Sequence, residues 1–419
     1  MKTKILLSGL CVLFSCYVFG QPYLQNGGNV NKSKQAYIAS KTDESGVLVT
    51  NEGTFSLENS KITTSGNTSS QENSSFFGLN AGVLAKSGSK IILNNCTVYT
   101  SGTGANGVFA TGKGSSVILN NDTIICLKEG GHGVDATLEG SLTLNNVYIN
   151  TSGAHGAAIS TDRGGGTVVV NGGEAIASGE DSPGIYSTGS ITVSNAIVKG
   201  ASSEAAVIEG ANTITLTNTQ MTAAKGTRDR GVFIYQSMSG DAIGNNGVFS
   251  MTGGSLTWPS ATGPLFYISN TTGVINLSNV TINNSSPILI KAAADVWGHA
   301  GTNGGNVVLT ADSQILSGNI ISDEHSSVSI SLKNKSVLTG AINKAAVTID
   351  ATSIWVVAGD SYITTLSDNA GITGTSITNI KGNGFTVYYD STLAANSFLG
   401  GKTYTLNGGG FLKSLTKKL

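Results

Sequence analysis

One copy of the unit that this chain repeats reads Gly107-Val108-Phe109-Ala110-Thr111, then Ser116-Val117-Ile118-Leu119-Asn120-Asn121, then Thr123-Ile124-Ile125. Each copy opens with a small residue and a β-branched residue, and the copies begin at Gly82-Val83, Gly107-Val108, Gly133-Val134, Ala158-Ile159, Gly184-Ile185, Ala206-Val207 and Gly231-Val232. These starts lie 25, 26, 25, 26, 22 and 25 residues apart. A sustained period in the twenties, built from short strands and Gly, Asn and Ser turns, is typical of a stacked solenoid.

Three strands in each copy supply the faces that one coil needs to close around a core. Apolar residues alternate with small or polar ones along each strand, as expected when one side faces inward. Parallel crossovers are right-handed as a rule. We therefore predict an all-β fold, a single-stranded right-handed parallel β-helix of about thirteen or fourteen coils, roughly 65 Å long at the usual strand spacing.

The first twenty residues have the pattern of a secretory signal peptide. Lys2 and Lys4 precede an apolar run from Ile5 to Phe19, and cleavage near Gly20 is the expected processing. Lipidation at Cys16 is the alternative. The run is short for a membrane span, and no other segment has about 20 apolar residues. We predict an exported protein with no membrane span after removal of the signal.

The remaining chain divides by the regularity of its repeats. We expect an N-terminal lead-in or cap over 21–45, the β-helix over 46–351, closing coils and a β cap over 352–412, and a frayed tail over 413–419. A polar insert, Asn67–Ser75, is predicted to be a loop. Two longer inserts, Gln236–Gly247 and Ala293–Gly305, fall between the first and second strands of their coils. Loops on a rigid scaffold often carry function.

Composition and charge exclude several classes of partner. The chain has 56 Gly, 12% charged residues and a formal net charge of -1, without a basic cluster. Electrostatic binding to nucleic acid or to an anionic membrane is therefore not expected. Cys11 and Cys16 belong to the signal, and Cys96 and Cys126 are out of register with each other. We predict two separate thiols and no disulfide.

The segment from Thr352 to Leu366 resembles the end of autotransporter passenger domains, whose pattern is W-x-V-x-G-D-S-x-x-x-x-L. Trp355, Gly359-Asp360-Ser361 and Leu366 match that pattern. In that family the region closes a β-helix and helps it to fold from its C-terminal end. Such proteins continue into a membrane β-barrel, which we do not expect for this chain, because the sequence runs only to Leu419. The resemblance implies an adhesin-like surface protein with a separate export or anchoring partner.

An Asn recurs where the second strand of most copies ends. Asn tolerates left-handed backbone angles, and its side chain bonds readily to neighbouring groups. We predict a structural column at one corner of the rod that satisfies polar groups there. Its members are Asn95, Asn121, Asn146, Asn195 and Asn218.

Catalysis on this scaffold requires paired carboxylates, or several acids on adjacent coils that hold calcium. The outward positions of the first strands are expected to be Leu84, Phe109, Asp135, Ser160, Tyr186, Ile208 and Phe233, in which Asp135 has no acid above or below it. Asp162 and Glu209 are assigned to other columns. His132, within a Gly-His-Gly fragment, occupies an ordinary repeat position. We therefore predict no catalytic residue, no metal and no cofactor.

Aromatic residues give the best candidates for binding, as an outward apolar stripe and as rings beside the two long inserts. A covering segment over the stripe, or packing of the rings against turns, is the structural alternative. The candidate binding residues are Phe109, Tyr186, Phe233, Tyr235, Trp258, Tyr267 and Trp297, with Asp241 and Asp295 beside the inserts.

These observations together predict a non-catalytic, adhesin-like binding protein, exported to the outer surface of a Gram-negative bacterium. Its partner is expected to be a host or environmental glycan or a surface protein. A carbohydrate-active β-helix enzyme of the polysaccharide lyase or galacturonase type is the first alternative. A structural surface component that self-assembles is the second.

Overall fold

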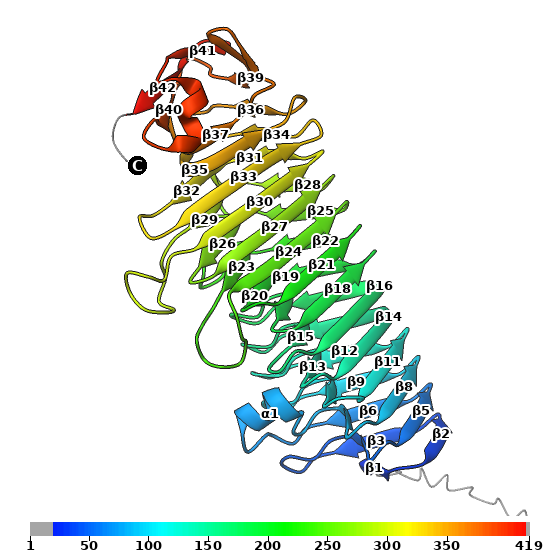
Figure 1. Ribbon diagram of the computed structural model, residues 1–419. Helices are drawn as coiled ribbons and strands as arrows, with labels where there is room; N and C mark the ends of the chain where they lie inside the picture. Colours follow the sequence, from blue (N-terminus) through cyan, green and yellow to red (C-terminus); the bar gives the residue numbers. More distant parts are fainter. Residues whose placement is uncertain (1–19, 416–419) are drawn as a thin grey trace, which may run out of the picture.

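The computed structural model describes residues 20–415. The predicted signal peptide up to residue 19, with Cys11 and Cys16, and the last four residues of the predicted tail lie outside the described residues. The described chain is a right-handed parallel β-helix of about 16 turns (Figure 1). The predicted fold class is confirmed. The predicted thirteen or fourteen coils were too few, and residues 23–39, expected as a lead-in or cap, form one of the additional coils.

Three parallel faces run the length of the rod, one for each strand of a coil. The first face consists of β1 (Tyr23–Asn26), β4 (Val47–Thr50), β7 (Val83–Lys86), β10 (Val108–Thr111), β13 (Val134–Thr137), β15 (Ile159–Thr161), β17 (Ile185–Ser187), β20 (Ala206–Glu209), β23 (Val232–Tyr235), β26 (Phe266–Ser269), β29 (Ile288–Ala292), β32 (Asn319–Ser322), the first parts of β35 (Ile342–Ile349) and β37 (Ser361–Ser367), β40 (Thr386–Asp390) and β42 (Phe411–Leu415).

The second face follows the first in each coil. It consists of β2 (Asn29–Ser33), β5 (Thr54–Glu58), β8 (Lys90–Asn94), β11 (Ser116–Asn120), the first halves of β14 (Ser141–Thr151) and β16 (Thr167–Ala177), β18 (Ser190–Ser194), β21 (Thr213–Thr217), β24 (Asn246–Thr252), β27 (Thr272–Ser278), β30 (Asn306–Asp312), β33 (Ser327–Lys333) and the later parts of β35 and β37.

The third face follows after the corner. It consists of β3 (Ala36–Ala39), β6 (Lys61–Thr64), β9 (Thr97–Thr100), β12 (Thr123–Cys126), the second halves of β14 and β16, β19 (Ile197–Gly200), β22 (Gln220–Ala223), β25 (Ser255–Trp258), β28 (Thr281–Asn284), β31 (Ile315–Ser317), β34 (Val337–Thr339), β36 (Ile354–Val356), β39 (Ser376–Lys381) and β41 (Tyr404–Asn407). The short β38 (Ile372–Thr373) pairs antiparallel with β39.

The core is a continuous column of side chains inside the coil. In the first face, Val108 and Ala110 point inward and are fully buried, and Val134 and Ala136 stack on them in register. Each strand thus buries alternate residues, which is what the period of two predicts. Cys96 and Cys126 are both buried and free, so the predicted absence of a disulfide between them is confirmed.

The corner between the second and third faces carries the predicted Asn column. All five of its residues have positive φ, from 48° to 56°. The side-chain hydrogen bonds run through the preceding residue of each coil: Asn120 Nδ2 donates to Asn94 Oδ1 at 2.9 Å, Asn145 Nδ2 to Asn120 Oδ1 at 2.8 Å, and Asn171 Nδ2 to Asn145 Oδ1 at 3.0 Å. We call this chain of amides the corner ladder. The column residues themselves supply the left-handed turn beside it.

Two segments near the N-terminal end of the rod differ from the sequence prediction. Residues 23–39 form a complete coil, β1 to β3, that pairs with the coil after it. The polar insert before the regular series is not only a loop, because residues Gln71–Phe77 form helix α1. Ser70 caps its N-terminus by accepting from Asn73 N, and Gly78 ends it with a φ of 70°.

The closing motif lies where expected in the stack, with Trp355 and Leu366 buried. Trp355 Nε1 donates to Gly340 O at 2.9 Å. Ser361 Oγ accepts from Ile342 N at 3.1 Å, and Asp360 Oδ1 accepts from Thr386 N at 2.8 Å. After it, β40 to β42 and the 3-10 helix η1 (Ala394–Leu399) cover the end of the rod (Figure 1). Strand β42 runs to Leu415, so residues 413–415 belong to a strand and not to a frayed tail.

Within residues 20–415, no helix is long and apolar enough to cross a membrane.

Candidate functional site

The candidate site lies on the outer side of the first face, where α1 and the two long loops project from the same side of the rod (Figure 1). Loop 236–245 joins β23 to β24, and loop 293–305 joins β29 to β30. The outward column of this face, in register, is Leu84, Phe109, Asp135, Ser160, Tyr186, Val207, Phe233 and Tyr267.

The register corrects one position of that column. We predicted Ile208, but Tyr186 pairs with Val207, and Ile208 pairs with Ser187 and is fully buried inside the coil. We aligned Ala206 with Gly184, the first residue of the preceding copy. In the structure Ala206 pairs with Ile185, the second residue of that copy, so the predicted repeat boundary is one residue late. A slip of one residue moves a strand's side chains to the opposite face.

Helix α1 covers the N-terminal part of the column. Gly78 lies against Phe109, since a Cβ on Gly78 would stand 2.7 Å from that ring. Thr137 Oγ1 donates to Phe76 O at 2.8 Å, and Gln71 Nε2 donates to Gly130 O at 3.1 Å. These contacts fix the helix on the rod. Phe109 is therefore fully buried, and its prediction as an exposed contact residue was wrong.

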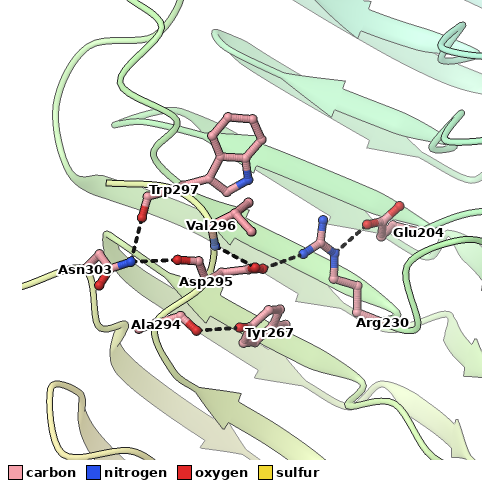
Figure 2. A network of polar contacts seen from close by, with 8 residues as sticks. All are labelled: Glu204, Arg230, Tyr267, Ala294, Asp295, Val296, Trp297 and Asn303. Carbon is pink, nitrogen blue, oxygen red and sulfur yellow. Dashed lines mark hydrogen bonds and ion pairs between the residues drawn. The ribbon is translucent and has the colours of Figure 1, made fainter. Parts of the chain in front are cut away.

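The two long loops cover the C-terminal part, and a buried ionic network holds one of them. Arg230 Nε lies 2.6 Å from Glu204 Oε1, and Arg230 Nη1 lies 3.3 Å from Asp295 Oδ2 (Figure 2). The same guanidinium sits 3.3 Å from the centroid of the Phe233 ring. Phe233 is consequently buried, and it too is not an exposed contact residue.

Loop 293–305 is fixed further by its own amides. Asn303 Nδ2 donates to Asp295 O at 2.7 Å and to Trp297 O at 2.8 Å, and Tyr267 Oη donates to Ala294 O at 3.1 Å (Figure 2). The Trp297 ring packs at a tilt on Tyr235, with centroids 5.6 Å apart. Trp297 is thus held as one wall of the site, and Tyr267 supports the loop from beneath.

Between helix α1 and loop 293–305 runs a groove in two connected compartments. The first, of about 410 Å³, is lined by residues that include Gln71, Glu129, His132, Asp162 and Ser75. The second, of about 200 Å³, is lined by residues that include Val207, Arg228, Arg230, Tyr235 and Trp297. Both share His155, Asp181, Pro183 and Tyr186. Because they share a wall, we treat them as one lateral groove along the rod.

Three titratable groups meet at the floor of the first compartment. Single ligand-type atoms of His132, Asp135 and Asp162 all lie within 4.8 Å of one another. Within the outward column Asp135 has no acid above or below it, as predicted, but Asp162, which we assigned to another column, lies beside it. Asp135 is fully buried, and neither of its carboxylate oxygens has a hydrogen-bond partner. Asp162 follows β15 directly and reaches the groove.

Burial sets the electrostatics of this acid pair. Burial raises the pKa of Asp135 well above its ordinary range, and the charge of Asp162 raises it further. Burial also raises the pKa of Asp162 to about 7, and the charges of Asp241 and Glu209 act in the same direction. Two carboxylates this close repel each other when both are ionised.

His132 is oriented by the backbone around it. Its Nδ1 accepts from Ala157 N at 3.0 Å, and its own backbone N–H donates to Asn106 Oδ1 at 2.8 Å. Burial lowers the pKa of the imidazole to about 4, so the ring is neutral at pH 7. Since Nδ1 is an acceptor, the single ring proton belongs on Nε2.

A further carboxylate, that of Glu209, lies under the aromatic part of the groove. Glu209 Oε2 accepts from Tyr186 Oη at 2.6 Å and from Tyr235 Oη at 2.8 Å, and Ser237 Oγ donates to its other oxygen. Burial raises the pKa of Tyr186 and that of Tyr235. Unlike Asp135, Glu209 is fully supplied with donors, and it holds the two rings in place.

Of the predicted binding residues, Tyr186, Tyr235 and Trp297 line the groove together, and the buried Phe233 ring lies in the same wall. Trp258 does not take part, because it points into the coil, is fully buried and donates from Nε1 to Gly263 O at 2.9 Å. Sequence reasoning missed Asp162 as a neighbour of Asp135. One signal was present, since Asp162 directly follows the strand that stacks on Val134–Thr137.

No family model matches this chain, and no curated protein shows detectable similarity to it.

Proposed function

We propose that this protein is an exported surface protein whose lateral groove binds an extended glycan. The observation that carries the proposal is the joint placement of Tyr186, Tyr235 and Trp297 along a groove that also contains charged and polar groups. Sugars present both apolar faces and hydroxyl groups, and they suit aromatic rings set beside hydrogen-bonding side chains. Export rests on the signal pattern of residues 1–20.

The charges of the groove favour a glycan over a nucleic acid. Acids occupy its floor and walls, including Asp162, Asp181 and Glu129, and these would repel phosphates. Arg228 is exposed at the other end of the groove, and it supplies one cation for an acidic sugar. The two connected compartments extend along several stacked coils. This shape suits a linear chain better than a compact small molecule.

Calorimetric titration of the purified chain with neutral and uronic-acid oligosaccharides tests this proposal. We expect Trp297→Ala to weaken binding about tenfold or more, equivalent to about 1.4 kcal/mol, because it removes a stacking surface. Tyr148→Ala is the matched control, since that ring is 37% exposed on the third face, away from the groove. Absence of binding to every oligosaccharide, or equal loss in both variants, contradicts the proposal.

Cleavage of the bound glycan is the second candidate function, favoured by the acid pair at the floor of the groove. Incubation with uronic-acid polysaccharides, followed by measurement of new reducing or unsaturated ends, distinguishes the two. Products that disappear in Asp162→Asn support cleavage. Binding without products supports a protein that only recognises its glycan.

A further inference from the structure

We propose that Asp135, Asp162 and Ser160 bind one hard divalent cation at the floor of the groove. The sequence analysis predicted no metal, and the proposal departs from that prediction. It does not depend on the glycan, because the site is assembled by side chains of the β-helix itself.

Several buried side-chain oxygens at the groove floor have no hydrogen-bond partner. Both carboxylate oxygens of Asp135 and the hydroxyl oxygen of Ser160 are buried and form no hydrogen bond. The two residues are adjacent in parallel register, so their side chains lie on the same side of the first face. Asp162 brings a further oxygen within 4.8 Å. The carboxylates of Asp135 and Asp162 and the hydroxyl of Ser160 therefore lie together in one small region of the groove floor.

Leaving those carboxylate oxygens unpaired costs free energy of folding when they are charged. Buried carboxylates in proteins are usually paired with a cation or supplied with donors, since an isolated buried charge costs several kcal/mol. Asp122, also buried, shows the usual solution, because it accepts from Cys96 N at 2.6 Å and from Asn120 N at 2.8 Å. The backbone N–H groups of Ala136 and Asp162 lie near enough to Asp135 to lower its pKa, but neither forms a hydrogen bond with its carboxylate oxygens. A cation between Asp135 and Asp162 supplies the missing partner and cancels their repulsion.

The ligand atoms available at the groove floor decide which cation the site can bind. A histidine that ligates a metal normally donates from its other ring nitrogen to an acceptor. His132 does the opposite, since its Nδ1 accepts from Ala157 N, and its Nε2 therefore carries a proton. The available ligands are then oxygens alone, which calcium, magnesium and manganese prefer over zinc. The remaining coordination positions fall to water that enters from the groove, which the half-buried Asp162 lines.

Titration of the chelator-treated full chain tests the proposal in the absence of any glycan. We expect one equivalent of Ca²⁺, Mg²⁺ or Mn²⁺ to bind by calorimetry and to raise the melting temperature. Asp135→Asn and Asp162→Asn should each weaken binding by about a hundredfold or more, because each removes a ligand. Asp241→Asn is the control, since it removes a charge that acts on Asp162 without removing a ligand, and it should change the affinity far less.

The stability of the metal-free variants separates loss of binding from loss of folding. Asp135→Asn should melt at a higher temperature than the metal-free parent, because it removes one of two repelling carboxylates and adds an amide donor toward Asp162. Binding of none of the three cations at one per chain overturns the proposal. So does unchanged affinity in both Asn variants, or preferential binding of Zn²⁺ that is lost in His132→Gln.

Discussion

The corner ladder and the groove floor both stack polar side chains along the rod, but only the ladder satisfies itself. Asn94, Asn120, Asn145 and Asn171 pass one hydrogen bond from each coil to the next. At the groove floor, Asp135 and Ser160 stack in the same kind of register, and their side-chain oxygens have no partner.

The difference follows from the chemistry of the two side chains. An amide carries both a donor and an acceptor, so identical amides stacked in register complete each other. A carboxylate only accepts, so another acid beside it adds repulsion instead of a bond. Two acids brought side by side thus require a partner from elsewhere, either backbone donors, of the kind that Asp122 has, or a cation. Orphaned acids on a solenoid are for this reason a sharper indicator of a ligand than stacked amides.

The largest expected effect concerns the groove side, at the buried ionic network. Arg230→Ala leaves the Glu204 carboxylate, whose side chain is 5% exposed, without its charge partner. We expect a loss of about 3–5 kcal/mol in the free energy of unfolding, measured by urea denaturation. Lys199→Ala is the control, because it breaks an outer pair with Glu174 whose side chains are 40% and 32% exposed. That loss should stay below about 1 kcal/mol; equal losses would contradict the ranking.

A smaller effect is expected at the corner, from the pH dependence of Asp122. Burial raises the pKa of this carboxyl to about 6, although two backbone amides oppose the shift. Its ordinary value of 3.8 applies to the unfolded chain. The unfolded chain therefore releases the proton first, and the contribution of Asp122 to stability is present below about pH 4 and is lost as the pH rises through about 6. The loss amounts to about 3 kcal/mol at most.

Asp122→Ser isolates this titration. Ser60 occupies the same corner position of an earlier coil, where its Oγ accepts from Gln35 N at 2.9 Å, so Ser keeps an acceptor for the backbone at residue 96. Unfolding free energies of parent and variant, measured from pH 3.5 to pH 7.5, should diverge between about pH 4 and pH 6 in favour of the variant. Parallel curves would show that Asp122 does not titrate in this range.

The smallest effect tests the ladder itself. Asn120→Asp places a carboxylate where an amide donated to Asn94 Oδ1, and two acceptors then face each other. We expect a loss of about 1 kcal/mol in unfolding free energy, since the site is partly exposed. Asn279→Asp is the control, because that residue is exposed at the same corner, with a φ of 53°, outside the ladder. A ladder variant no less stable than the control would remove the contrast with the groove floor.

Much of the fold could be predicted from the repeat, because stacking makes sequence period and structure period the same. The inward alternation, the corner turns and the two long inserts follow from residues that are close in sequence. The prediction failed where one coil is shorter, at Ala206, because a single-residue slip exchanges the inner and outer faces. It failed also at α1, since a short helix in a polar insert leaves little periodicity to detect.

The sequence by itself therefore determined the rod, its three faces and the aromatic residues nearest to its working side. Only the tertiary structure decided that α1 and Arg230 cover Phe109 and Phe233, that Trp258 faces inward, and that Asp162 meets Asp135. The physical reason is the same in each case. Local periodicity fixes which way a side chain points from its own coil, whereas cover, burial and charge depend on segments that the stacking and the loops bring together from elsewhere in the chain.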